Sequence, residues 1–295
     1  MKSLVLGGGG FLGSHVADQL SISGHAVTLY DRQPSLWLRS DQKMIVGDIL
    51  DERLLEEAIS SADVVYNFAA IADLNEAIDK PIESVRINIL GNLLALNFCK
   101  KYSIKRFVFA SSVYVNSRHG GFYRCSKQAS EQYIIEFQRK YGLDYTILRY
   151  GSLYGPRANH TNGLYRTIKN ALETGRINYV GSPDTMREFI HVEDAAVASV
   201  EILNDQFRNA TITLTGQQPI KMKDLLYMLA EILDYQDSVE FIEGGYEGHY
   251  VRTPYAYQPA LGKTYIPSVH VDLGQGLLQL IDEVRSRIMD NNDKS

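Results

Sequence analysis

The segment 2–32 constrains the fold most strongly, because two apolar runs in it enclose a glycine cluster and a helical pattern. The runs at 3–6 and 26–30 have the length and composition of buried strands, and apolar residues recur with helical spacing from Phe11 to Leu20. Strand, glycine turn, helix and strand in this order predict a βαβ unit. The two strands of such a unit are parallel, and the helix covers one face of their sheet.

The alternation of strand and helix patterns continues to residue 151. The further apolar runs lie at 43–47, 63–70, 106–112 and 145–151, and the helical patterns between them at about 51–60, 82–102 and 123–141. We therefore predict an α/β fold of the Rossmann type, in which a doubly wound parallel sheet carries helices on both faces.

After Tyr154 the regular alternation ends and the pattern becomes mixed. A loop-like stretch and a helical pattern follow, and two further helices are predicted near 221–233 and 274–289. We predict a dinucleotide-binding domain at 1–155, to which 186–205 return, and a smaller mixed α/β substrate-binding domain at 156–295.

The glycine cluster has a spacing that suits a phosphate-binding turn. Gly7, Gly10 and Gly13 lie between the first predicted strand and the first predicted helix. Such a turn needs a backbone that approaches a pyrophosphate without an intervening Cβ and directs helix amides at the anion. A flexible turn is the alternative, because a glycine spacing alone is a weak signal.

Carboxylates at the ends of the next two predicted strands indicate which dinucleotide binds. Asp31 follows Gly13 by 18 residues, where its carboxylate can accept hydrogen bonds from both ribose hydroxyls and would repel a 2′-phosphate. This favours NAD over NADP, although the adjacent Arg32 leaves NADP open. Asp48 and Ile49 follow the third strand, where the adenine would lie; Asp48 could instead cap the next helix.

Composition and charge exclude several classes of partner. The net charge of −5 includes no basic stripe for nucleic acid or an anionic membrane. The chain lacks an uninterrupted apolar run of membrane-spanning length and a signal-peptide pattern, so we expect a cytoplasmic protein. Cys99 and Cys125 show no metal-binding spacing, and we expect both to be packing residues in a reducing compartment.

A Tyr-x-x-x-Lys spacing occurs twice in the chain. Tyr123 and Lys127 would lie on one face of a predicted helix, close enough for the ammonium group to act on the phenol. Tyr165 and Lys169 have the same spacing, and roughly one such pair is expected by chance in a chain of this composition. The spacing alone therefore does not identify a catalytic pair.

A series of short segments resembles one known family. In chain order they are GGGGFLG, GDILD, NFAA, NILGN, FASS, YRCSK, LRYGSLYGP and MREFIHVEDAA. Together they resemble the extended short-chain dehydrogenase/reductase family, particularly its nucleotide-sugar epimerases and dehydratases, over roughly residues 1–205.

This resemblance implies a catalytic set. Tyr123 would remove a proton from a sugar hydroxyl while the carbon-bound hydride passes to NAD, and Lys127 would stabilise the phenolate and hold the nicotinamide ribose. Ser112 would bridge the substrate oxygen and the phenol, although the register leaves Ser111 as an alternative. The other implied cofactor contacts are Phe11, Leu12, Phe68, Ala69, Ala70 and Asn88.

The resemblance also implies residues that bind the substrate. Arg187 and Arg252 would hold the nucleotide pyrophosphate with paired donors, although Arg252 could instead form a surface ion pair. Ser152 replaces an asparagine that is usual in the family and can still donate one hydrogen bond. Asn162 either contacts the nucleotide or forms a turn, and His191 is expected to be structural, at a joint between domains.

These observations predict an NAD-dependent nucleotide-sugar epimerase that acts at C4 of a UDP-hexose. Val113 and Tyr114 stand where dehydratases and decarboxylases of the family carry acids, which disfavours those two reactions. The alternatives are a nucleotide-sugar reductase or dehydrogenase with net redox change, and a non-catalytic dinucleotide-binding regulator. The resemblance further implies a homodimer formed by the helices near 82–102 and 123–141.

Overall fold

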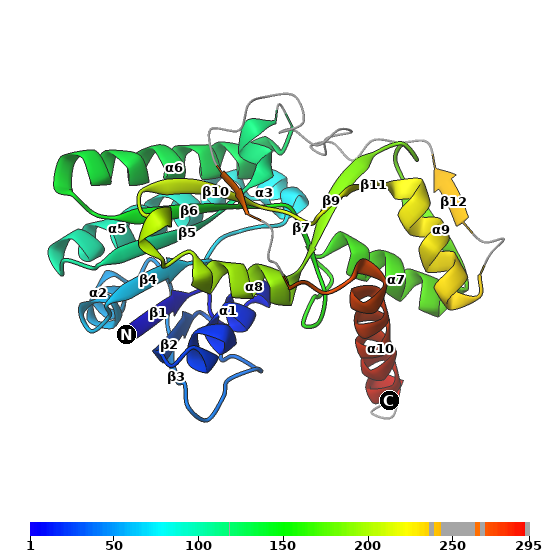
Figure 1. Ribbon diagram of the computed structural model, residues 1–295, viewed down its shortest axis with the longest axis horizontal. Helices are drawn as coiled ribbons and strands as arrows, with labels where there is room; N and C mark the ends of the chain where they lie inside the picture. Colours follow the sequence, from blue (N-terminus) through cyan, green and yellow to red (C-terminus); the bar gives the residue numbers. More distant parts are fainter. Residues whose placement is uncertain (118, 236–238, 243–262, 266–268, 293–295) are drawn as a thin grey trace.

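The computed structural model describes residues 1–117, 119–235, 239–242, 263–265 and 269–292, which form two lobes. In Figure 1 a central sheet with its helices lies on one side, and a smaller lobe with the C-terminal helix lies on the other. Within the described part of the chain, no helix combines the length and the apolar character needed to cross a membrane.

The first lobe is built on a parallel sheet with the strand order β13-β10-β6-β5-β4-β1-β2-β3. The strands are β1 (Lys2–Leu6), β2 (Ala26–Asp31), β3 (Lys43–Val46), β4 (Val64–Asn67), β5 (Arg106–Ser112), β6 (Tyr145–Tyr150), β10 (Ala210–Leu214) and β13 (Lys263–Tyr265). The order reverses between β1 and β4, which creates the crevice where doubly wound sheets bind their ligands. The predicted α/β fold is therefore confirmed.

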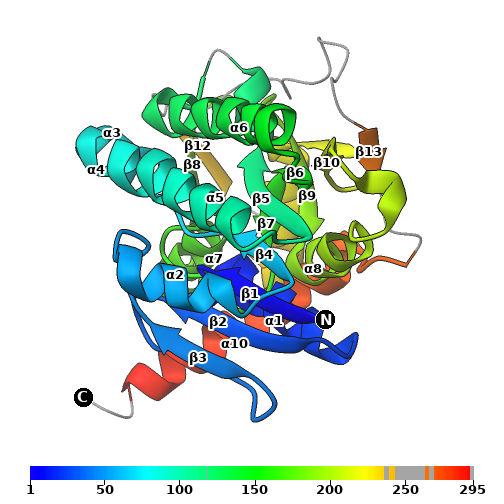
Figure 2. The ribbon, with the colours of Figure 1, turned by 90° about the vertical axis from the view of Figure 1, so that its left-hand side faces the viewer.

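Helices cover both faces of this sheet (Figure 2). The helices α1 (Phe11–Ile22) and α8 (Val192–Glu201) pack together on one face, and α2 (Glu52–Ser60), α5 (Asn92–Lys101) and α6 (Gly121–Tyr141) cover the other. Alternate residues of a strand face opposite sides, so along β1 Leu4 and Leu6 enter one core while Val5 enters the other.

The region predicted as one helix near 82–102 is divided in the structure. A short helix α4 (Pro81–Ser84) leads into a π-helical segment η1 (Val85–Gly91), and α5 follows directly. The chain enters this region through α3 (Leu74–Asp79), which the sequence pattern did not predict. The short helix η2 (Val113–Asn116) connects the end of β5 to the approach of α6.

Among the residues that the structure describes, the second lobe contains two small sheets and three longer helices. One sheet joins β7 (Ser152–Tyr154), β9 (Met186–His191) and β11 (Pro219–Lys221), and the other joins β8 (Ile177–Val180) and β12 (Val239–Ile242). The helices α7 (Gly163–Thr174), α9 (Met222–Leu233) and α10 (Leu273–Asn292) share one apolar core. The helices predicted near 221–233 and 274–289 correspond to α9 and α10.

The chain crosses between the lobes more than once. After β9, α8 packs on α1, the short helix η3 (Asp205–Phe207) follows, and β10 then pairs with β6 in the large sheet. We propose that the first lobe comprises residues 1–151 and a returning segment from α8 to Leu214, because β7 and β9 belong to the small sheet of the second lobe. The first lobe therefore ends before the expected 155, and the return covers 192–214 instead of 186–205.

One expectation about the cysteines is wrong. Cys99 is buried in the core beneath α5, as expected, but Cys125 is exposed on α6. The helical pattern places Cys125 two residues before Lys127, so these two side chains leave the helix in different directions and only Lys127 enters the interior.

The core of the second lobe gives a first prediction. Leu280→Ala on α10 should lower the free energy of unfolding by about 2–5 kcal/mol, because the leucine is 0% exposed and its removal leaves a cavity. Leu278→Ala on the same helix should change it by only about 0.5 kcal/mol, because that leucine is 42% exposed. Urea denaturation measures both values, and equal losses would contradict the packing of α10.

Candidate active site

The glycine turn brings two backbone segments into close contact. A Cβ on Gly7, whose φ is 77°, would lie 2.6 Å from the amide nitrogen of Ala69, and a Cβ on Gly13 would lie 2.1 Å from the carbonyl oxygen of Gly7. Gly10 precedes α1 and provides no side-chain cap, and the first turn of the helix contains no acidic residue. The amides at the start of α1 thus form a cradle for an anion.

Asp31 lies at the end of β2, next to this turn. Its carboxylate accepts hydrogen bonds from the backbone amides of Gly9, at 3.0 Å, and Gln33, at 3.3 Å. The neighbouring Arg32 is exposed. The carboxylate is therefore fixed beside the glycine turn, where a ribose attached to the pyrophosphate would lie.

Asp48 does not cap the following helix, so that alternative is wrong. The N-cap of α2 is Asp51, whose side chain accepts from the amide of Leu54, whereas the Asp48 carboxylate closes a turn by accepting from the amide of Leu50 at 2.9 Å. Ile49 is buried, and a Cβ on Gly91 of η1 would approach it to 2.8 Å.

The segment after β4 forms the other wall of the crevice. The amide of Phe68 donates to Leu6 of β1 at 2.8 Å, and Ala69 and Ala70 continue beside the glycine turn. Asn88 holds the end of this segment, because its side chain exchanges two hydrogen bonds with the backbone of Ile71, at 2.8 and 3.0 Å. The same amide donates to Ser126 on α6, at 2.9 Å.

Ser112, Tyr123 and Lys127 gather at the carboxyl end of β5. Ser112 ends the strand, as predicted, and Tyr123 and Lys127 lie in the first two turns of α6. The Lys127 ammonium group donates to the carbonyl of Ala110 at 2.7 Å and lies 5.7 Å from the centre of the Tyr123 ring. The Ser112 hydroxyl acts on the Tyr123 side chain and lowers the pKa of its phenol, while it also accepts from the backbone amide of Tyr114 at 3.3 Å.

The surroundings shift the pKa values of both ionisable groups toward the neutral form. Burial raises the pKa of Tyr123 to about 12, against the hydrogen bond from Ser112, which lowers it. Burial lowers the pKa of Lys127 to about 7, against the negative charge of Glu131, which raises it. The protein alone therefore holds an un-ionised phenol next to a lysine that is half charged at neutral pH.

The two serines at the end of β5 have different surroundings. Ser111 is paired in register with Arg149 of β6, and its hydroxyl donates to Glu131 of α6 at 2.5 Å. Ser112 lines the cavity described below, together with Tyr123. The hydroxyl of Ser112 thus faces the cavity, while that of Ser111 is used within the protein.

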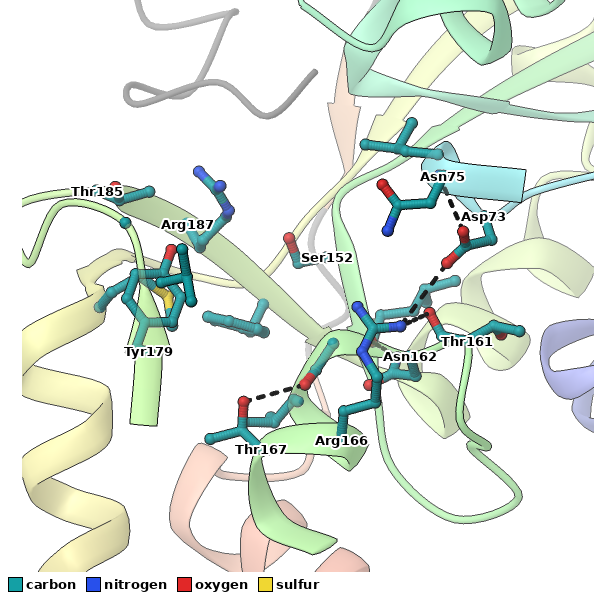
Figure 3. A pocket seen from close by; sticks show the side chains of 18 of the residues that line it. Asp73, Asn75, Ser152, Thr161, Asn162, Arg166, Thr167, Tyr179, Thr185 and Arg187 are labelled. Atoms are coloured by element: carbon teal, nitrogen blue, oxygen red, sulfur yellow. Dashed lines mark hydrogen bonds and ion pairs between the residues drawn. The ribbon is translucent and has the colours of Figure 1, made fainter. Parts of the chain in front are cut away.

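A cavity of about 690 Å³ opens between the two lobes beside these residues. Ser152, Asn162 and Arg187 line it, as do several polar side chains from α3, α7 and β8 (Figure 3). Asn162 caps α7 by accepting from the amide of Tyr165 at 3.0 Å and donates to the carbonyl of Leu153 at 2.8 Å. It therefore forms the turn before α7 and lines the cavity as well.

Arg187 comes from β9 and is largely buried in the cavity wall. It donates to the carbonyl of Met186 at 3.0 Å. Arg252, the second predicted arginine, lies outside the described residues.

An ion pair across the cavity was not predicted from the sequence. Asp73 caps α3 and lies 3.7 Å from Arg166 of α7, which also donates to the carbonyls of His160 and Thr161 (Figure 3). In the sequence, the only sign of a role for Asp73 is its capping position before a short helix. The spacing between Asp73 and Arg166 does not indicate that the two residues meet. The pair ties the two lobes together at the cavity.

The other tyrosine–lysine pair and His191 lie elsewhere. Tyr165 is buried in the core of the second lobe, and Lys169 lies 3.7 Å from Glu173 on the helix surface. His191 is buried against Tyr154, with ring centres 5.2 Å apart, and burial lowers its pKa to about 4. None of these residues lines the cavity.

The fold places a cradle for a dinucleotide next to a separate substrate cavity, and this arrangement defines a class of enzyme. The sequence model of the NAD dependent epimerase/dehydratase family matches residues 3–212, and the chain belongs to this family. Gly7 and Gly13 leave no room for side chains, and α1 begins without a side-chain cap, so the cradle fits the pyrophosphate of NAD. NAD is accordingly the cofactor of this enzyme.

Three similar proteins have related names. A putative UDP-glucose 4-epimerase of Methanocaldococcus jannaschii is 26% identical, with 96% of this chain and 98% of that protein covered. A UDP-N-acetyl-alpha-D-glucosaminuronate decarboxylase of Bacillus cytotoxicus is 27% identical, with 76% and 78% covered. The crystal structure of a UDP-glucose 4-epimerase from Thermotoga maritima with UDP-glucose has a TM-score of 0.87 at 26% identity and covers 98% of this chain and 100% of that one.

The glycine turn gives a second prediction. Gly13→Ala should lower NAD affinity about tenfold or more, because its methyl group would collide with the backbone of Gly7 and displace the amides that bind the pyrophosphate. Gly163→Ala is the matched control, since a Cβ there meets only the far end of the Arg166 side chain, at 4.0 Å. Calorimetric titration of NAD into the stripped proteins measures both, and unchanged affinity in Gly13→Ala would contradict the assignment of the cradle.

Proposed function

We propose that the enzyme inverts C4 of a UDP-linked hexose by transient oxidation to a keto-sugar. The observation that carries this proposal is the grouping of Ser112, Tyr123 and Lys127 at one end of β5, where Ser112 and Tyr123 line a cavity shared by both lobes and Lys127 lies buried behind them. Similarity to proteins named UDP-glucose 4-epimerase supports the choice of substrate. We further propose that Ser152, Asn162 and Arg187 hold the nucleotide sugar.

In the proposed reaction, residues of the chain transfer a proton, and the cofactor accepts and returns a hydride. When bound, NAD supplies the hydride acceptor, the donor for the return step and a positive charge on its nicotinamide ring. Tyr123 takes the proton of the sugar hydroxyl, and Ser112 holds the same oxygen through its own hydroxyl. Lys127 stabilises the phenolate, and after the sugar has presented its other face Tyr123 returns the proton.

The absence of a suitable acid supports epimerisation over elimination or decarboxylation. The helix η2 follows Ser112 directly and contributes Val113 and Tyr114 rather than a carboxylate. Asp73 is the one residue with a carboxylate among the described residues that line the cavity. It caps α3 and pairs with Arg166. Elimination needs an acid that can protonate a leaving hydroxyl, and Asp73 is committed to other contacts.

We propose that two copies of the chain pair through η1 and α6. Both elements expose large apolar side chains, which is typical of surfaces that become covered on association: Val85, Leu90, Phe122 and Tyr133. We also propose a cytoplasmic location, because Cys99 and Cys125 are both free thiols.

The reaction itself is tested by NMR. We expect the purified protein, without added cofactor, to convert one member of a panel of UDP-, dTDP-, CDP- and GDP-sugars into its C4 epimer, followed through the anomeric and C4 proton signals. Bound NAD is regenerated in each cycle, so no net NADH should form. Conversion only when NADH or NADPH is consumed would favour a reductase, and no conversion under either condition would favour a regulator.

The role of the phenol is tested by a pair of matched variants. Tyr123→Phe should lower kcat about 10²- to 10⁴-fold while NAD binding is retained, because only the proton-transferring hydroxyl is removed. Tyr165→Phe should retain most activity, since that ring is part of the core of the second lobe. Steady-state kinetics on the epimerised sugar measure both, and full activity in Tyr123→Phe would refute its role as the base.

A further inference from the structure

Behind the catalytic residues lies a buried hydrogen-bonded network that the proposed reaction does not use. The Glu131 carboxylate accepts from the Ser111 hydroxyl at 2.5 Å and from two nitrogens of Arg149, at 3.0 and 2.6 Å. Arg149 also donates to the side-chain oxygen of Asn116 at 3.4 Å. The side chains of Arg149 and Glu131 are only 9% and 4% exposed, so this ion pair lies in the interior.

The network joins the structural elements that carry the catalytic residues. Ser111 immediately precedes Ser112 on β5, and Asn116 ends η2, the helix that follows Ser112. Glu131 lies on α6 one turn beyond Lys127 and on the same face. Neither Glu131 nor Arg149 lines the cavity, so neither would touch the substrate.

We propose that Glu131, held by Ser111 and Arg149, is a positioning residue for the epimerisation that fixes α6 against the end of β5 and favours the charged form of Lys127. This inference rests on the proposed function, because it concerns the lysine of the same site.

The charge argument follows from the burial of Lys127. Burial lowers the pKa of Lys127 to about 7, and the negative charge of Glu131 raises it. Without that charge the pKa of Lys127 would fall further, and the positive charge of Arg149 would no longer be balanced. A neutral lysine cannot stabilise the phenolate of Tyr123.

Among the described groups that surround Lys127, Glu131 supplies the carboxylate that can act on its charge. Its own helix provides Tyr123 and Glu131, β6 provides Arg149, and β5 provides the carbonyl of Ala110 and the ring of Phe109, whose centre is 4.6 Å away. The helix η2 brings no carboxylate or basic group.

Arg106 is also buried, but it begins β5, four residues before Ala110, whereas the remaining charges on the helices that pack against α6 are at the surface. They belong to α3, α4, η1, α5 and the residues between them, where Asp79 is exposed and the others form ion pairs or a cation–aromatic contact: Glu76 with Lys80, Glu83 with Arg86, Glu56 with Lys101, and Lys100 with Tyr141. Exposed pairs of this kind are screened by water, so they have little influence on a buried lysine.

The test is a titration that does not depend on activity. The enzyme is labelled with lysine carrying ¹³C at Cε, and the Lys127 signal is assigned by its loss in Lys127→Met. We expect Glu131→Gln to move the titration midpoint of Lys127 down by roughly one pH unit. Glu136→Gln removes a charge from an exposed ion pair on the same helix and should leave the midpoint unchanged. A midpoint in Glu131→Gln equal to that of the unaltered enzyme would overturn the proposal.

A double variant keeps the test decisive if Glu131→Gln alone fails to fold. Glu131→Gln/Arg149→Met removes both charges, so no unpaired charge remains in the interior. Its midpoint should lie between those of the single variant and the unaltered enzyme, because the anion and the more distant cation are both lost. If this variant folds and its midpoint is unchanged, Glu131 has no electrostatic role.

Kinetics form the second arm of the experiment. In Glu131→Gln the alkaline limb of the kcat profile should move to lower pH, with kcat at pH 8 about tenfold lower. KM should be unchanged, because Glu131 lies outside the cavity. A loss of kcat with no shift of the limb would reduce Glu131 to a structural role. If the enzyme proved inactive on every nucleotide sugar, the titration would still show whether the charge of Glu131 raises the pKa of Lys127.

Discussion

The parallel pairing of β5 with β6 is the constraint on which the catalytic site depends. In this register Ser111 lies opposite Arg149 and Ser112 opposite Tyr150. Because successive side chains leave a strand on opposite faces, the two adjacent serines cannot serve the same site. Ser111 is directed toward Glu131 under α6, and Ser112 is thereby left at the cavity with Tyr123. A slip of one residue would exchange them and bring Ser111 to the cavity instead.

The ion pair under α6 is better explained by its location than by its contribution to stability. A buried ion pair gains little net stability, because the cost of removing both charges from water offsets most of their attraction. Removing one partner is nevertheless severe, at about 3–5 kcal/mol, because the other charge stays unpaired. Glu131 and Arg149 occupy a region next to β5 from which the negative charge of Glu131 acts on Lys127. Proximity to the catalytic lysine therefore gives the pair a purpose that packing alone does not.

The sequence predicted the features that local patterns determine. Six strands of the large sheet, the glycine turn and the helix that carries Tyr123 and Lys127 follow from periodicity and spacing. The sequence favoured Ser112 and left Ser111 open, because which of the two reaches the cavity depends on pairing with Arg149, which is 38 residues further along (149 − 111). The contact of Asp73 with Arg166 was missed for the same reason. By contrast, α8 could have been found locally, because Glu193 and Asp194 precede an alanine-rich stretch.

The opposed pKa shifts of Tyr123 and Lys127 bear on how the proposed base would be activated. With a pKa of about 12, the Tyr123 phenol stays protonated at neutral pH, and Lys127, whose pKa is about 7, offers the phenolate only limited stabilisation. Additional positive charge must enter the site before the phenolate can form, and the oxidised nicotinamide carries such a charge. In the proposed reaction, the burial that raises the pKa of Tyr123 would couple proton removal to the binding of NAD.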